Sequence, residues 1–174
     1  MSSPDDLVDR ATDLTDALAA ELDDSDRRVS VAESLTSGKI AVHLGAAGGS
    51  SGWFAGGVVA YNSDVKYDVL GVRRGPVVSA VAAEQMATGV ATLLGTEIAV
   101  AVTGVGGPEE QEGQPVGTVF IGVHDEGTCT AEEHHFEGDA EDILAATTVR
   151  ALELLLTCVR AREGSAAGAA HGKR

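Results

Sequence analysis

Several small polar residues follow the first apolar segment of the chain, in the stretch AESLTSG at residues 32–38. Ser34, Thr36 and Ser37 carry hydroxyl groups, and Glu33 places a carboxylate beside them. A serine becomes a nucleophile when a neighbouring base accepts its proton. Hydroxyl groups at a helix start also cap free N–H groups, and the same N–H groups can hold an anion. The stretch therefore fits either helix capping or ligand binding.

A lysine and a tyrosine stand five residues apart in a second stretch, YNSDVK at residues 61–66. Lys66 is one of only three lysines in the chain, and Asn62 is its one asparagine. A lysine serves as a cation for phosphate, or as a base where its surroundings lower its pKa. An ordinary solvated helix residue is the alternative for Lys66. We take Tyr61, Asn62 and Lys66 as candidate site residues.

A third stretch, TGVGGPEEQEGQPVG at residues 103–117, is rich in glycine, which lets a backbone approach a ligand closely. It lacks the GK[ST] of a phosphate-binding Walker loop. It also departs from the dinucleotide-binding pattern GxGxxG, because Glu109 occupies the third glycine position. A plain connecting loop is the alternative. The candidate binding residues here are Thr103, Gly104, Gly106 and Gly107.

All three stretches follow segments with the apolar character of strands, at residues 28–32, 55–61 and 98–102. Ligands of open α/β sheets bind at the carboxyl ends of the strands, so we expect the three stretches to meet at one edge. Two further strands are predicted at 116–123 and 128–136. Helices are predicted from the start of the chain to about 24, and at 36–44, 63–70, 79–94 and 139–162.

This order of elements predicts an α/β fold, a three-layer α/β/α sandwich with a mixed, mostly parallel sheet. We expect a single domain over residues 1–162 and a disordered tail over 163–174, where the sequence is of low complexity. The apolar face of the last helix, with Leu152, Leu155, Leu156 and Val159, could pack internally or against another subunit. We expect a homo-oligomer, a dimer.

Acidic residues dominate the composition, with 27 Asp and Glu against 12 Lys and Arg and a net charge of -15. Such a surface repels phosphate backbones, so direct nucleic-acid binding is not expected. The spread of acid along the chain favours a salt-rich cytoplasm, although an ordinary acidic protein shows the same trend. No segment has the length or the apolar character of a membrane span or signal peptide, so we expect a cytoplasmic protein without membrane contact.

Metal or cofactor binding is not predicted. Cys129 and Cys158 lack the spacing of a metal site, and we expect free thiols. His134 and His135 are adjacent on a predicted strand, so they point to opposite faces and cannot chelate one ion together.

Taken together, the three stretches resemble the CinA C-terminal domain family, whose active members are nicotinamide mononucleotide deamidases. AESLTSG resembles the family's AES-C-T-G-G, and SSGWFAGGVVAYNSDVK at 50–66 is similar to its SSxWFxxGxVxYSNxxK. TGVGGP at 103–108 resembles [ST]GxAGP, and PVGTV at 115–119 matches the strand that follows. The resemblance covers residues 8 to 160.

The resemblance implies an amidohydrolase that converts nicotinamide mononucleotide to nicotinate mononucleotide and ammonia. By motif, Ser34 is then the nucleophile, Lys66 its base, and Tyr61 a residue that supports proton transfer or orients the amide. The other residues of these motifs form the expected substrate-binding set: Glu33, Thr36, Ser37, Gly38, Asn62, Thr103, Gly104, Gly106 and Gly107. A non-catalytic, nucleotide-binding relative is the alternative.

The chain departs from the family pattern in FEGDAEDIL at 136–144, where the family has F-x-GDR-xx-VR with arginines that face the site. Ala140 and Leu144 stand in place of those arginines, and Arg150 further along is a candidate substitute. Glu109 also stands where a glycine is common. These differences predict weaker phosphate binding or a changed substrate.

Overall fold

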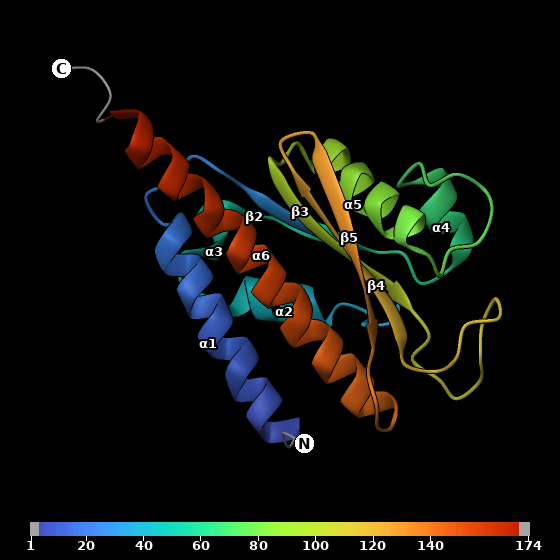
Figure 1. Ribbon diagram of the computed structural model, residues 1–174. Helices are drawn as coiled ribbons and strands as arrows, with labels where there is room; N and C mark the ends of the chain where they lie inside the picture. Colours follow the sequence, from blue (N-terminus) through green and yellow to red (C-terminus); the bar gives the residue numbers. More distant parts are fainter. Residues whose placement is uncertain (1–3, 171–174) are drawn as a thin grey trace.

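A five-stranded sheet with helices on both faces forms the centre of the computed structural model, which describes residues 4–170 and the side chains of residues 6–161 (Figure 1). β1 pairs in parallel with β2 and β3, whereas β4 is antiparallel to β3 and β5. The strand order is β2-β1-β3-β4-β5. The strands are β1 (Val29–Glu33), β2 (Phe54–Val59), β3 (Ile98–Gly104), β4 (Thr118–Asp125) and β5 (Thr128–His135). The predicted mixed α/β/α sandwich is thereby confirmed, with β4 alone among the described strands running against the others.

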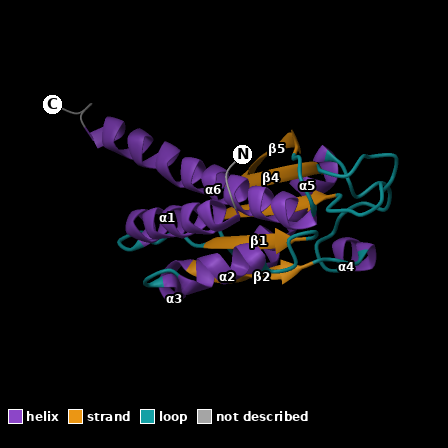
Figure 2. Cartoon of the chain, turned by 90° about the horizontal axis from the view of Figure 1, so that it is seen from below, coloured by secondary structure: helices purple, strands orange, loops and turns teal. Residues whose placement is uncertain are grey.

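Two layers of helices cover this sheet, with α1, α2 and α6 on one face and α5 on the other (Figure 2). The helices are α1 (Pro4–Leu22), α2 (Lys39–Ala46), α3 (Ser50–Trp53), α4 (Ser63–Asp68), α5 (Ala80–Leu94) and α6 (Ala140–Ala170). The single turn α3 was not predicted, because its glycine and serines indicate a loop.

α6 also differs from its predicted bounds, since it continues to Ala170 rather than ending near Arg162. Alanines favour the helical backbone there more than the few glycines oppose it. Residues 171–174 of the predicted tail lie outside the described residues. The division into one domain and a tail stays a prediction.

Alternating side chains of the central strands build two apolar cores. Val100 and Val102 of β3 pack toward α1 and α6, whereas Ala99 and Ala101 face α5. The small alanines let α5 lie close to the sheet. Gly122 of β4 has the same effect, because a Cβ atom added to it would lie 2.4 Å from the Ala83 carbonyl oxygen of α5.

The apolar face of α6 is covered within the chain. Leu152, Leu155 and Val159 are fully buried and Leu156 is 7% exposed, in the core that α1 shares with α6. Of the two packings that the sequence left open, the structure shows packing of α6 within the chain. No helix within residues 4–170 combines the length and the hydropathy needed to cross a membrane.

Candidate active site

The hydroxyl of Ser34 and the amine of Lys66 lie in direct contact, with Nζ 2.9 Å from Oγ. β1 ends at Glu33, so Ser34 begins the turn that leaves the sheet edge, and Lys66 lies in α4 after the neighbouring strand β2. Both side chains are buried, Lys66 with 2% of its surface exposed and Ser34 with 8%. The expected meeting of two stretches 32 residues apart is therefore observed.

Burial lowers the pKa of the Lys66 ammonium, and the carboxylate of Glu112 opposes that effect. Desolvation penalises the charged form, so the neutral amine becomes more available at a given pH. A neutral amine within hydrogen-bond distance of a hydroxyl can accept its proton. The pair thus has the geometry of a nucleophile and its base.

The carboxylate of Glu33 caps α2. It accepts hydrogen bonds from Thr36 Oγ1 at 2.6 Å and from the N–H groups of Gly38, Ile40 and Ala41 at 2.8–3.2 Å. It is 1% exposed. The chain's own carboxylate therefore occupies the positive end of α2, and no free anion site remains there. These contacts are those of helix capping, one of the two alternatives for this stretch, and the binding of substrate by Glu33 and Thr36 stays a prediction.

A cavity of about 260 Å³ opens over the Ser34–Lys66 pair. Its walls come from the turn after β1, the start of α4, the segment before α5, the loop after β3 and the first turns of α6. The residues that line it are Ser34, Leu35, Tyr61, Lys66, Val77, Val78, Thr103, Gly104, Val105, Gly106, Gly107, Glu109, Gln111, Ala140 and Leu144. All three predicted stretches contribute to it, so the expected convergence at one sheet edge is present.

Tyr61 and Thr103 line this cavity in different ways. Tyr61 is 69% exposed, and no hydrogen bond joins its hydroxyl to another described residue. Its predicted help in proton transfer or amide orientation stays a prediction. Thr103 is buried, and its hydroxyl donates to the Val77 carbonyl oxygen at 2.7 Å. Thr103 therefore joins two segments that line the cavity, the end of β3 and the segment before α5.

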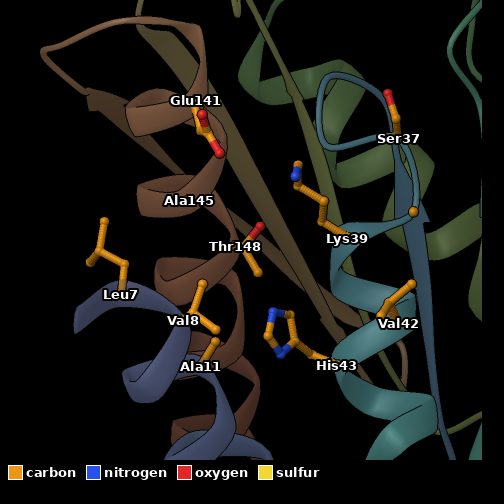
Figure 3. Close-up of a pocket in the computed structure, with 11 residues that line it drawn as sticks. Leu7, Val8, Ala11, Ser37, Lys39, Val42, His43, Glu141, Ala145 and Thr148 are labelled. Carbon is orange, nitrogen blue, oxygen red and sulfur yellow. The ribbon is translucent and has the colours of Figure 1, made fainter. Parts of the chain in front are cut away.

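Three other predicted binding residues lie away from the Ser34–Lys66 cavity. Ser37 and Gly38 line a separate cavity of about 440 Å³ between α1, α2 and α6, shown in Figure 3. Both residues have positive φ angles, which turn the chain sharply from β1 into α2. The Asn62 side chain accepts a hydrogen bond from the Asp64 N–H at 2.8 Å and caps α4. These contacts are structural, and the binding of substrate by Ser37, Gly38 and Asn62 stays a prediction.

Backbone N–H groups offer further hydrogen-bond donors near the site. In the turn after β1, those of Leu35 and Thr36 have no partner among the described residues, whereas the following ones are bonded within the chain. The N–H groups of Gly106 and Gly107 likewise have no partner within the described chain. Gly104, by contrast, is required by packing, since an added Cβ would lie 2.5 Å from the Thr118 carbonyl oxygen.

Glu112 was not predicted, although it organises the cavity. Its carboxylate accepts hydrogen bonds at 2.8 Å from the N–H groups of Val77 and Val78, which line the cavity. The same carboxylate raises the pKa of Lys66 against the effect of burial. The only signal in the sequence was its place in an acidic glycine-rich loop, where Glu109 and Glu110 are equally prominent.

The positions that depart from the family pattern do face this cavity. Ala140 and Leu144 both line it, so an apolar surface stands where the family has arginines. Arg150 does not compensate, because its guanidinium binds Glu132 of β5 at 2.8 Å and Glu153 at 3.2 Å. Its suggested role as a substitute was wrong.

The class that this fold and site define is shown by comparison with known proteins. The chain matches the CinA C-terminal domain family over residues 11–159 and belongs to that family. A CinA-like protein of Geobacter metallireducens is 42% identical over 133 residues, which is 73% of this chain and 32% of the relative. A CinA-like protein of Citrifermentans bemidjiense is 36% identical over 149 residues, or 82% of this chain and 36% of the relative.

Solved structures of CinA superfamily proteins share the fold. One from Klebsiella pneumoniae superposes with a TM-score of 0.82 at 32% identity, covering 86% of this chain and 98% of the other. One from Escherichia coli has a TM-score of 0.81 at 36% identity, covering 84% and 88% of the two chains. The chain spans about a third of the curated relatives' length. An activity of a whole relative is therefore only proposed for this chain.

Proposed function

We propose that the chain is an amidohydrolase that deamidates a nicotinamide nucleotide, with nicotinamide mononucleotide as the first substrate to test. Its membership of the CinA family and the buried Ser34–Lys66 pair support this proposal. The observation that carries it is the 2.9 Å contact between a hydroxyl and an amine of lowered pKa, at a cavity that residues of all three polar stretches line.

In the first half of the reaction, Ser34 Oγ attacks the carboxamide carbon while Lys66 Nζ accepts the hydroxyl proton. The carbonyl oxygen gains negative charge, and the free N–H groups of Leu35 and Thr36 are the candidate donors to it. Each such donor typically contributes about 3 kcal/mol to the stability of the transition state. The C–N bond then breaks, and Lys66 returns the proton to the leaving nitrogen, which departs as ammonia.

In the second half, water attacks the ester that joins the acyl group to Ser34. Lys66 accepts a proton from this water and returns it to Ser34 Oγ as the ester bond breaks. The products are the nicotinate nucleotide and the free enzyme. The scheme balances without a metal or a redox partner.

Replacement of the nucleophile tests the proposal. We expect Ser34→Ala to reduce ammonia release from nicotinamide mononucleotide by about 10³-fold or more, because no acyl intermediate can form. Ser50→Ala removes a hydroxyl that only bonds the Gly45 carbonyl oxygen, and it serves as the matched control. Wild-type protein that releases no ammonia over a range of pH and salt would show that the proposal is wrong.

A second candidate function is nucleotide binding without turnover, and the walls at Ala140 and Leu144 favour it. Loss of positive charge there is compatible with a cavity that keeps its shape but positions the amide poorly. Titration calorimetry separates the two functions. A protein that only binds nicotinamide mononucleotide gives a heat of binding but releases no ammonia.

A further inference from the structure

The charge of the residues that line the cavity indicates which nicotinamide compounds the proposed amidohydrolase accepts. This inference rests on the proposed function. Among the described residues that line the cavity, only Lys66 and Glu109 carry a charge. Lys66 is bound to Ser34 Oγ and must be neutral to act as the base. The one remaining charge is therefore a carboxylate.

A phosphate dianion is poorly matched to these walls. Leu35, Leu144 and Ala140 offer no hydrogen-bond donor from their side chains, and Leu144 and Leu35 lie next to Gly106. Desolvation of a dianion is costly unless cations or several donors replace its water. The donors that remain near these walls are all neutral: the N–H groups of Gly106 and Gly107, the Tyr61 hydroxyl and the Gln111 side-chain amide. They serve the hydroxyl groups of a ribose as well as they serve a phosphate.

Apart from Lys66, no cation of the described chain lines the cavity. Arg150 is held by Glu132 and Glu153, and Arg74 by Asp64 and Asp68. Lys39 lines the separate cavity beside α1 and α6, where Figure 3 shows it between α2 and α6. The net charge of -15 further disfavours the approach of an anion and favours that of a cation.

We infer that the cavity accepts a pyridinium carboxamide nucleoside without a phosphate at least as well as the phosphorylated mononucleotide. The nucleoside keeps the carboxamide that Ser34 attacks and carries a positive pyridinium ring. Glu109 at the exposed mouth of the cavity attracts that ring, whereas it repels a phosphate.

Ammonia release from nicotinamide riboside and from nicotinamide mononucleotide tests this inference with the full chain. We expect the riboside to have the equal or higher kcat/KM, with its advantage largest at low salt, where steering is strongest. A kcat/KM for the mononucleotide about tenfold or more above that for the riboside would overturn the inference. That result would indicate that Gly106 and Gly107 hold the phosphate.

A positive charge introduced into the cavity wall tests whether the lack of cations decides between the two compounds. We expect Leu144→Arg to raise the preference for the mononucleotide about tenfold, because a guanidinium binds phosphate strongly. Leu144→Met, of similar size without charge, should leave the preference unchanged. Ala140→Arg is an independent probe at an exposed position, where the added side chain does not disturb the core. If neither arginine alters the preference, the inferred basis of selectivity is wrong.

Binding measurements separate this inference from the proposed hydrolysis. If neither compound releases ammonia, the proposed function fails, and calorimetry with both compounds then decides the inference. Tighter binding of the riboside supports it. Tighter binding of the mononucleotide, or no binding of either, overturns it.

Discussion

At the scale of single residues, Lys66 places a buried amine next to the Ser34 hydroxyl at a cost in stability. Burial lowers its pKa below the ordinary 10.5, so below that pH the unfolded chain holds this proton more readily than the folded chain. Since the unfolded state then binds more protons, the free energy of unfolding rises with pH between the lowered pKa and about 10.5.

Lys66→Met should therefore abolish ammonia release while it raises the free energy of unfolding at about pH 7 by roughly 1–3 kcal/mol. The gain should shrink as the pH approaches about 10.5, where the wild-type amine is neutral in both states. Urea unfolding at several pH values measures both effects. An unchanged or lower stability at neutral pH would contradict this account of the buried amine.

Burial lowers the pKa of that amine, and the carboxylate of Glu112 offsets part of this effect. Glu112→Gln removes the carboxylate that raises the pKa of Lys66, while its amide oxygen can still accept from the N–H groups of Val77 and Val78. We expect the acidic limb of the kcat/KM profile to move to lower pH. Glu110→Gln, an exposed change in the same loop, should leave the profile in place. Identical profiles for the two variants would rule out this role of Glu112.

At the scale of elements, the turn between β1 and α2 depends on one buried carboxylate. Glu33→Gln keeps one acceptor oxygen and replaces the other with an amide nitrogen, which cannot accept a hydrogen bond. Either Gly38 and Ile40, which donate to Oε2, or Ala41, which donates to Oε1, then lose their acceptor. We expect a loss of about 2–3 kcal/mol in the free energy of unfolding, because buried donors are left without partners. Glu137→Gln at an exposed position is the control, and equal stability of the two variants would refute the capping role.

At the scale of the whole molecule, the net charge of -15 predicts a dependence on salt. Chloride salts screen the repulsion among surface carboxylates, so Tm should rise by about 5 °C or more between low and molar salt. Thermal unfolding in potassium chloride measures this, since sulfate would also strengthen apolar burial. A Tm that is constant or falls with chloride would contradict adaptation to a salt-rich cytoplasm. The expected dimer and the cytoplasmic location stay predictions.

The sequence by itself determined the order of the main elements and the meeting of Ser34 with Lys66. Hydrophobic periodicity is a local property, and it placed each of the five strands within a few residues of its observed bounds. Parallel strands bring their carboxyl ends to one edge, so the polar stretches after β1, β2 and β3 had to converge. The single turn α3 and the extension of α6 escaped this reasoning, because small residues are compatible with both loop and helix.

Only the tertiary structure decided what each polar side chain does at that edge. Glu33 caps α2, Ser37 and Gly38 line the separate cavity between α1, α2 and α6, and Arg150 pairs with Glu132 of β5. Glu112 reaches Val77 and Val78 from a loop more than thirty residues away in the sequence. The direction of a side chain after a tight turn, and the partner of a charge, depend on elements that are distant in the sequence. No local pattern encodes them.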